Sequence, residues 1–271
     1  MPELPEVETT RRGIEPHVTN KTVTAIKVRT KKLRWPIPRN LSRLLVGQEI
    51  QSITRRAKYF LFNVPTGTLI IHLGMSGSLR ITDVSHHAEK HDHVEFHFDN
   101  KLLRFRDPRK FGAVLWTKED PYAHKLLASL GPEPLDKKAF TTEYLYALSR
   151  KRQVSVKEFI MNAKVVVGVG NIYATEALFE SGIHPLRAAG KVSKQRYAAL
   201  VDDIQTVLSN AIKLGGTTLK DFTREDGKPG YFKNELKIYG RSGEACMVCN
   251  NTIKTIRIGQ RSSAYCSKCQ R

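Results

Sequence analysis

The sequence predicts an α+β protein of several domains, in which a leading helix and a β-sandwich or barrel precede an all-α unit and a C-terminal zinc ribbon. Three observations predict this order. Short β-type runs separated by turn residues fill the first half, and apolar residues at helical spacing fill much of the second. All four cysteines lie within residues 246–271. Each pattern is typical of a different kind of folding unit.

Residues 1–130 are expected to form the helix-led β domain. The segment Pro5–Ile14 has proline and acidic residues in its first turn, as the N-terminus of a helix does. In Val94–Phe98 apolar and polar residues alternate, as a strand with one buried face requires. Several such strands predict a sandwich or barrel. Examples of such runs are Thr22–Val28, Phe60–Val64, Thr68–His72, Val94–Phe98 and Gly112–Trp116.

The pattern changes at Gly131–Leu135, where two prolines interrupt any regular element. We place the domain boundary there and expect residues 131–152 to be a linker. Residues 153–235 are expected to be helical. Within them, Asn171 is predicted to N-cap a helix that stops at Gly182.

A longer helix is predicted from Ser193 to the glycine pair Gly215-Gly216, because its apolar residues keep helical spacing throughout. Residues 223–234 have no periodicity and are predicted to be a loop.

The cysteine spacing predicts a zinc ribbon over residues 236–271. Cys246 and Cys249 form one CxxC pair, and Cys266 and Cys269 form the other. Four thiolates complete a tetrahedron and leave no position for water, so we expect one structural Zn²⁺. Two disulfides are the alternative, although they are rare in the cytoplasm.

The composition is that of a globular protein, with 40% hydrophobic and 26% charged residues. No stretch approaches the roughly 20 apolar residues that a membrane span needs. The N-terminal residues Met1–Glu6 are acidic and contain proline, whereas a secretory signal has a basic flank and an apolar core. We therefore expect a cytoplasmic protein with no membrane partner.

The net charge is strongly positive: the chain has 45 Lys and Arg residues and 26 Asp and Glu residues, which gives a formal net charge of +19. Such a field attracts polyanions, and nucleic acid is the most abundant of them. Charge alone leaves open an anionic lipid partner or a basic protein that is merely soluble. The basic residues are dispersed, with small clusters at Lys31-Lys32, Arg55-Arg56 and Arg150–Arg152, which favours a folded binding surface over a basic tail.

Pro2 offers reactive chemistry if the initiator methionine is removed, because the chain then begins with a secondary amine. α-Amino groups have a pKa of about 7.7 to 8.0, against about 10.4 for lysine, so more of the amine is neutral at pH 7. With an aldehyde, a secondary amine forms a cationic iminium that favours elimination at the adjacent carbon. Taken alone, proline at position 2 is also a common start of a protein.

The whole chain resembles the bacterial formamidopyrimidine-DNA glycosylases, a family that removes 8-oxoguanine and ring-opened purines from DNA. Its opening, Pro2–Thr9, is closely similar to the opening of that family. The further matching motifs are Arg56–Tyr59, His72–Gly77, Lys90–His93, Asp107–Gly112, Gly131–Leu135, Val167–Tyr173 and Gln260-Arg261.

The resemblance implies a β-sandwich with a leading helix, a helix-two-turn-helix domain and a zinc finger. It implies a base excision repair enzyme that acts on damaged double-stranded DNA, first as a glycosylase and then as a lyase that cuts the strand by β and δ elimination. We expect a monomer with one structural zinc ion and no organic cofactor.

Four residues receive catalytic roles from the resemblance. It makes Pro2 the Schiff-base nucleophile at C1′ and Glu3 the acid that protonates the sugar as its ring opens. Lys58 matches a strand-borne lysine that contacts phosphate and carries protons, and Arg261 matches the finger arginine that contacts the phosphate beside the lesion. Solvated surface is the ordinary alternative for Lys58 and Arg261. For Glu6 we favour a simple interaction with the helix dipole.

The remaining matches are DNA contacts. A glycosylase turns its target base out of the stack, and Met75, Arg109 and Phe111 match the residues that fill the vacancy. A core position is the alternative for Met75 and Phe111, but both stand in turn-rich contexts. The family's phosphate-contacting residues are matched by His91, Lys151, Arg152 and Asn171. Residues 223–234 match the segment that closes over the everted base and are our candidate for lesion selectivity.

Two other functions are weighed against this one. A sister family excises oxidised pyrimidines on the same scaffold, but it opens with glycine where this chain has Leu4. A non-catalytic zinc-ribbon protein would bind DNA without cutting it, and the presence of both Pro2 and Glu3 argues against that reading.

Overall fold

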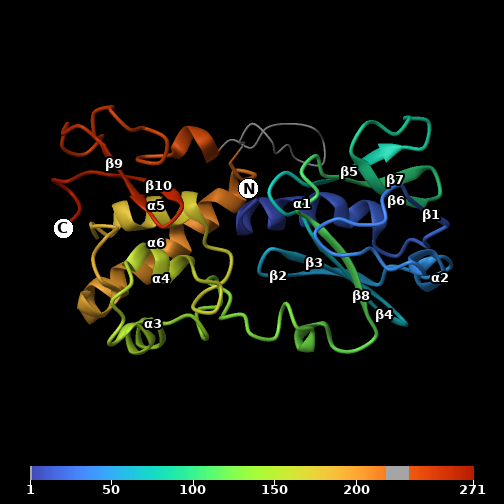
Figure 1. Cartoon of the computed structure of the whole chain (residues 1–271), viewed down its shortest axis with the longest axis horizontal. Helices are drawn as coiled ribbons and strands as arrows, with labels where there is room; N and C mark the ends of the chain where they lie inside the picture. The colour runs from blue at the N-terminus through green and yellow to red at the C-terminus, as the bar shows by residue number, and fades with distance from the viewer. Residues whose placement is uncertain (1, 218–231) are drawn as a thin grey trace. The chain divides into compact units, whose positions relative to one another are not determined.

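The computed structural model describes residues 2–217 and 232–271, and the chain forms two compact units (Figure 1). The first unit comprises Met1–Ser129 and Leu214–Tyr231, and the second comprises Leu130–Lys213 and Phe232–Arg271. Within the described residues, no helix is long and apolar enough to cross a membrane. Residues 223–231 of the loop expected to select the lesion lie outside the described part of the chain.

The first unit is the predicted β-sandwich with a leading helix. Both of its sheets have four strands, and all strand pairs are antiparallel. One sheet has the order β1 (Ala25–Val28), β6 (Asp92–Phe98), β7 (Lys101–Arg106), β5 (Ser78–Asp83). The other has the order β2 (Ser52–Arg56), β3 (Tyr59–Val64), β4 (Gly67–His72), β8 (Ala113–Thr117). A short helix, α2 (Leu41–Leu45), lies between β1 and β2 in the sequence, and a 3-10 turn, η1 (Pro121–Ala123), follows β8.

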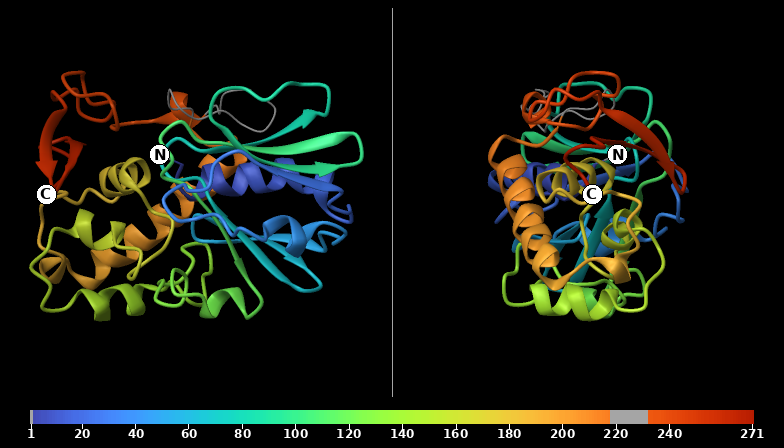
Figure 2. Two further views of the ribbon diagram at one scale, coloured as in Figure 1. Left: turned by 45° about the vertical axis from the view of Figure 1, so that its right-hand side comes forward. Right: turned by 90° about the vertical axis from the view of Figure 1, so that its left-hand side faces the viewer.

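Helix α1 (Leu4–Val18) packs between the two sheets (Figures 1 and 2). It contacts β2 and β3 of one sheet and β5 and β7 of the other. Its buried residues Val7, Ile14 and Val18 belong to the same core as the aromatic residues of both sheets. Because a buried helix lies where its apolar side chains are covered, this packing fixes the direction of the N-terminal residues.

Strand β7 was not among the predicted runs because charged residues interrupt its apolar pattern. Arg104 is nevertheless buried, since its guanidinium reaches a carboxylate oxygen of Glu95 at 2.8 Å and lies 3.6 Å from one of Asp92. A buried charge is tolerated when it is paired in this way. The ion pairs therefore allow a segment with charged residues to form a central strand of the sheet.

The second unit joins a helical part to a two-stranded ribbon. Its helices are α3 (Thr142–Ser149), α4 (Val156–Met161), α5 (Asn171–Glu180) and α6 (Lys194–Lys213), with 3-10 turns η2 (Ala189–Lys191) and η3 (Phe232–Glu235). Helix α5 contacts α4, α6 and strand β10. The ribbon pairs β9 (Lys254–Ile258) with β10 (Arg261–Tyr265).

Two details of this unit differ from the sequence predictions. The stretch 131–152, expected to be a linker, contains helix α3, whose Leu145 is fully buried. The prediction that Asn171 is an N-cap was wrong by one residue, because Gly170 is the N-cap and Asn171 begins helix α5. The Asn171 side chain instead donates from Nδ2 to the carbonyl oxygen of Ser262 in β10, at 3.3 Å.

Candidate active site

The N-terminus of α1 places a carboxyl group beside the first residues of the chain. Glu3 is the N-cap, and a capping box joins it to Glu6: the backbone N–H of Glu3 donates to Glu6 Oε2 at 2.8 Å, and the Glu3 side chain accepts from the backbone of Glu6. Pro2 is buried, and both glutamates are 2% exposed. This reciprocal pair holds Glu3 next to Pro2 in one orientation.

Glu6 has a larger structural role than the sequence suggested. Its Oε1 accepts the backbone N–H of Thr217 at 2.8 Å, although 211 positions separate the two residues. The neighbouring Gly216 has φ +81°, and a Cβ there would lie 3.1 Å from Glu6 Oε1. The Glu6 carboxylate therefore joins two distant chain segments, which is more than the helix-dipole interaction that we favoured.

Lys58 lies in the tight turn between β2 and β3, beside the half-buried His72. Burial, and then the positive charges of Lys58 and Arg34, lower the pKa of His72 to about 4. The neutral ring accepts the backbone N–H of Gly74 at its Nδ1, at 3.0 Å. The His72 ring packs at a tilt against the Tyr59 ring, with 4.6 Å between the ring centroids. His72 therefore connects the Lys58 turn to the loop that carries Met75.

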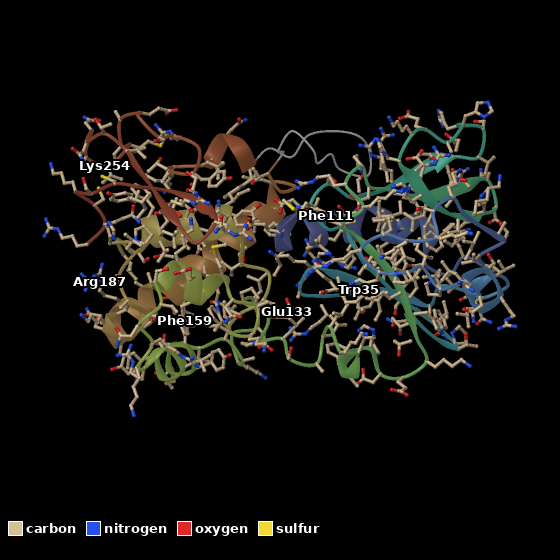
Figure 3. The ribbon with its side chains drawn as sticks, in the orientation of Figure 1. Trp35, Phe111, Glu133, Phe159, Arg187 and Lys254 are labelled. Atoms are coloured by element: carbon tan, nitrogen blue, oxygen red, sulfur yellow. The ribbon has the colours of Figure 1, made fainter. Side chains whose placement is uncertain are left out.

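The structure brings Met75, Arg109 and Phe111 together on two adjoining loops. A Cβ on Gly74 would lie 2.4 Å from the carbonyl carbon of Phe111, so the two backbones touch. The Arg109 guanidinium lies 4.9 Å from the centre of the Phe111 ring. Met75 is 37% exposed and Phe111 is 44% exposed, which excludes the core alternative for both. Figure 3 labels the Phe111 side chain.

His91 precedes β6, with a left-handed backbone at φ 78°. Its carbonyl oxygen accepts the N–H of Asp107 at 3.0 Å, just before the loop that carries Arg109 and Phe111. The His91 and His93 ring centroids are 6.3 Å apart. All the DNA-contact candidates of the first unit thus lie on turns around one end of β6 and β7.

In the second unit, Lys151 and Arg152 are exposed, whereas the adjacent Arg150 is structural. Arg150 donates to the carbonyl oxygens of Gly190 and Val192, both at 2.9 Å, and its guanidinium stacks 3.9 Å from the centre of the Tyr146 ring. Of the cluster Arg150–Arg152, only the last two residues are therefore presented to solvent.

Arg261 is the first residue of β10 and lies opposite Ile258, at the tip of the hairpin, as predicted. Its side chain is exposed. The ribbon is held to helix α5 by Lys157, which is 1% exposed and donates from Nζ to Thr175 Oγ1 and Ser263 Oγ, both at 2.7 Å. These bonds give the Arg261 hairpin a fixed base within its own unit.

Sequence reasoning missed two buried charges of this unit, Lys157 and Glu176. The Glu176 carboxylate accepts backbone N–H groups of three successive residues, 237–239, at the entry to the ribbon. Burial raises its pKa. A charged residue among apolar neighbours at helical spacing, as Glu176 is between Ala174 and Ala177, was the one signal that the sequence offered.

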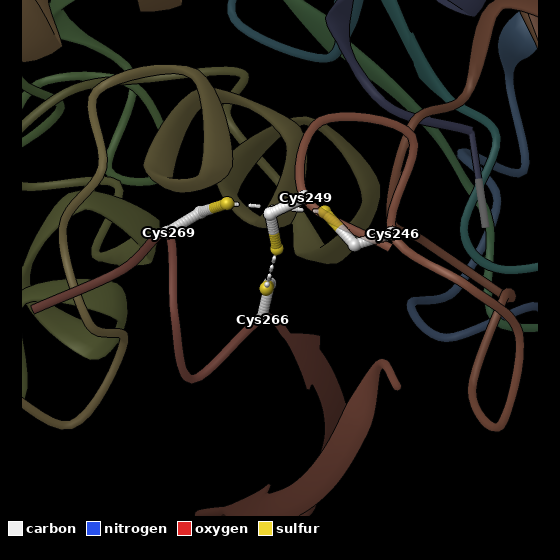
Figure 4. A group of neighbouring side chains, drawn as sticks. All are labelled: Cys246, Cys249, Cys266 and Cys269. Atoms are coloured by element: carbon white, nitrogen blue, oxygen red, sulfur yellow. Dashed lines mark hydrogen bonds between the residues drawn. The ribbon is translucent and has the colours of Figure 1, made fainter. Parts of the chain in front are cut away.

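The four cysteines form a site that fits zinc (Figure 4). Their sulfur atoms all lie within 4.8 Å of one another, and the shorter separations are 3.5 Å for Cys249 with Cys266 and 3.9 Å for Cys246 with Cys269. A tetrahedral Zn²⁺ with Zn–S bonds of about 2.3 Å requires sulfur separations of about 3.8 Å. A disulfide requires about 2.05 Å, so the disulfide alternative does not hold.

Models of known families match three consecutive parts of the chain. The model described as "Formamidopyrimidine-DNA glycosylase N-terminal domain" matches residues 1–114, and "Formamidopyrimidine-DNA glycosylase H2TH domain" matches residues 130–223. "Zinc finger found in FPG and IleRS" matches residues 243–271, which contain the four cysteines.

Individual relatives match over the full length. The formamidopyrimidine-DNA glycosylase of Stutzerimonas stutzeri is 57% identical and that of Idiomarina loihiensis is 54% identical, each over 272 residues and 100% of both chains. Among solved structures, a complex of Lactococcus lactis Fpg with DNA containing an abasic site has a TM-score of 0.93 at 32% identity, covering 99% of both chains. A complex of the same enzyme with DNA containing N7-benzyl-Fapy-dG has a TM-score of 0.92 at 33% identity, covering 100% of both.

Proposed function

This chain belongs to the formamidopyrimidine-DNA glycosylase family, and from that premise we propose how its own residues act on damaged DNA. The protein is a base excision repair enzyme: a DNA glycosylase for oxidised purines that also has abasic-site lyase activity. Its ribbon holds one structural zinc ion.

Pro2 is the nucleophile and Glu3 the acid. The Pro2 nitrogen forms a bond to C1′ of the damaged nucleotide and loses its proton, while the N-glycosidic bond breaks and the base leaves with a proton. The C1′–O4′ bond then breaks, O4′ takes the carboxyl proton of Glu3, and a C1′ iminium remains. The observation that carries this proposal is the buried capping box, which holds Glu3 beside Pro2.

The iminium drives strand cleavage. It makes the protons at C2′ acidic, and loss of one expels the 3′ phosphate in the β elimination. Loss of a proton at C4′ then expels the 5′ phosphate in the δ elimination. Lys58 and Arg261 are proposed to contact the phosphates beside the lesion, where a cation stabilises a departing oxyanion. Water finally releases the sugar fragment and returns Pro2 to its free amine.

Both units are proposed to bind the DNA backbone. His91 in the first unit and Lys151, Arg152 and Asn171 in the second are the phosphate contacts. Exposure of the Lys151 and Arg152 side chains supports this role. Asn171 is also the first residue of helix α5, and a helix N-terminus attracts an anion. We propose residues 1–130 as the catalytic domain, and residues 153–235 and 236–271 as the helical and ribbon DNA-binding domains.

Met75, Arg109 and Phe111 are proposed to fill the space that the everted base leaves. Methionine and phenylalanine can lie between bases, and arginine can hydrogen-bond to the orphaned partner base. The exposure of all three side chains and the contact of Arg109 with the Phe111 ring support this role. Residues 223–234 are proposed to select the lesion. We further propose that the protein works as a monomer in the cytoplasm.

The substrate class is tested with duplex DNA that carries a single lesion. Under single-turnover conditions, excision of 8-oxoguanine opposite cytosine should exceed excision of an oxidised pyrimidine from a matched duplex by about tenfold or more. The reverse order would assign the chain to the pyrimidine-excising function of the sister family. DNA binding without release of either base would support a non-catalytic binding protein.

Phe111→Ala should lower excision of 8-oxoguanine opposite cytosine by about 10- to 100-fold. The unfilled vacancy costs a few kcal/mol, and each 1.4 kcal/mol corresponds to about tenfold. The loss should be partly rescued when the lesion lies opposite an abasic gap, and the salt dependence of binding should not change. As the matched control, Lys151→Ala with Arg152→Ala should weaken all DNA binding and flatten the salt slope by about one unit per contact. A several kcal/mol loss of unfolding free energy in Phe111→Ala would instead indicate a core residue.

Removing a zinc ligand should affect metal content and DNA binding together. In Cys266→Ser the ribbon loses one of four thiolates, so zinc per protein, measured by atomic absorption, should fall well below one. Arg261→Ala is the control, because it should keep the zinc and the melting temperature but weaken DNA binding and strand cleavage. Full activity in a metal-free preparation would refute the structural role of the zinc.

A further inference from the structure

We propose that Asp107 is a positioning residue for base eversion: its buried carboxylate holds the loops of Met75, Arg109 and Phe111 in one arrangement. This inference deepens the proposed function and rests on the vacancy-filling role of those three residues. Asp107 itself is fully buried, so it acts through the loops and does not touch the DNA.

The two carboxylate oxygens bind different loops. Oδ1 accepts the hydroxyl of Ser76 at 2.9 Å, next to Met75. Oδ2 accepts the backbone N–H of Gly112 at 2.7 Å, directly after Phe111. The backbone N–H of Arg109 lies between these partners, 3.3 Å from both Asp107 Oδ1 and Ser76 Oγ. One side chain thus fixes the backbone beside all three vacancy-filling residues.

The backbone of Asp107 forms hydrogen bonds with a third segment, His91–His93. Its N–H donates to the carbonyl oxygen of His91 at 3.0 Å, and its own carbonyl oxygen lies 2.9 Å from His93 Nε2. That carbonyl oxygen also accepts the N–H of Lys110 at 3.2 Å. The proposed phosphate contact at His91 is therefore anchored to the same residue as the vacancy-filling loops.

Local geometry shows that this arrangement is closely fitted. Lys110 has a left-handed backbone at φ 56°, which the chain between Asp107 and Gly112 must accommodate. A Cβ on Gly112 would lie 2.6 Å from Phe105 Cζ and 3.0 Å from Asp107 Oδ2, so only glycine lets this N–H reach the carboxylate. The exposed Arg109 and Phe111 side chains stand on this turn and take their direction from it.

Asp107→Asn tests the role with little change of side-chain volume. Its amide has one acceptor oxygen, whereas Asp107 uses two, so either Gly112 or the Ser76–Arg109 pair must lose its partner. In single-turnover assays, Asp107→Asn should lower excision of 8-oxoguanine opposite cytosine by about tenfold or more. With the lesion opposite an abasic gap, where stacking is already lost, the rate should stay within about twofold of wild type.

Glu95→Gln is the matched control. Glu95 in strand β6 is also a buried carboxylate of the first unit, but it pairs with Arg29 and Arg104, away from the two loops that carry Met75, Arg109 and Phe111. Glu95→Gln should lower the melting temperature. It should leave unchanged the ratio between the rate of excision opposite cytosine and the rate of excision opposite an abasic gap. If Asp107→Asn does not fold, Ser76→Ala provides the same test, because it removes the 2.9 Å hydrogen bond to Asp107 Oδ1. Ser76→Ala should likewise lower excision opposite cytosine more than excision opposite an abasic gap.

A double variant distinguishes the positioning role of Asp107 from the vacancy-filling role of Phe111. If Asp107 acts through Phe111 and its neighbours, adding Asp107→Asn to Phe111→Ala should cost much less than Asp107→Asn costs alone. Fully additive losses, or equal losses on both substrates, would overturn the positioning role while the function of Phe111 stands. Wild-type excision by Phe111→Ala alone would overturn both.

Discussion

Glu3→Gln should abolish base excision while leaving the affinity for lesion-containing DNA nearly unchanged. The amide has the size of the carboxyl group but cannot donate its proton, and general acid catalysis contributes on the order of 10²- to 10⁴-fold. The capping box should survive in part, because the Glu3 backbone N–H still donates to Glu6 Oε2. The variant should therefore be folded and bind DNA, yet release 8-oxoguanine at least about a hundredfold more slowly.

A pre-formed abasic site separates the two activities of Glu3→Gln. Cleavage there starts from an aldehyde, so it needs less help with opening the sugar ring and should survive better than excision. Glu6→Gln is the informative comparison, because its amide can keep only one of two backbone contacts, to Glu3 or Thr217. It should weaken both activities. Equal loss of excision and abasic-site cleavage in Glu3→Gln would contradict the role of Glu3 as the acid.

Pro2→Gly should leave covalent trapping weakened but detectable. Glycine keeps an N-terminal amine, but the amine is primary, and its imine can lose the proton on nitrogen and with it the positive charge. Retention of Met1 ahead of Pro2 should abolish trapping, because the proline nitrogen is then in a peptide bond. The measurement is the fraction of protein joined to abasic-site DNA after borohydride reduction.

Lys58→Ala is the control for this experiment. Lys58 is the lysine whose positive charge helps to lower the pKa of His72, and we propose that it contacts phosphate. Its removal should slow cleavage without preventing the trapped complex from forming. Loss of trapping in Lys58→Ala together with full trapping in the variant that retains Met1 would move the nucleophile from Pro2 to Lys58.

The sequence was sufficient for the elements that depend on local pattern. Helix α1, the alternating strand β6 and the CxxC pairs all follow from spacing along the chain, and the structure confirms them. Strand β7 was not predicted because its Arg104 looks like a surface residue in the sequence. Its burial depends on ion pairs with Asp92 and Glu95 of strand β6. The start of helix α5 was misplaced by one residue because the Asn171 side chain bonds to Ser262, far along the chain.

In the candidate site, too, some residues could be predicted from the sequence and others could not. The resemblance named the exposed side chains Met75, Arg109 and Phe111, and the structure brings them together. It did not indicate what holds them, since Asp107 and Glu6 act through hydrogen bonds to backbone groups that are distant in sequence. Backbone N–H groups are the same in every residue except proline, so no residue pattern reveals which of them a buried carboxylate will bind.

The site of the covalent bond shows whether Pro2 is the nucleophile. The wild-type enzyme is mixed with duplex DNA that carries 8-oxoguanine opposite cytosine, reduced with borohydride and digested, and the joined peptide is sequenced by tandem mass spectrometry. We expect one adduct, on the nitrogen of Pro2, with Met1 absent. An adduct on Nζ of Lys58 or of any other lysine would contradict this role of Pro2.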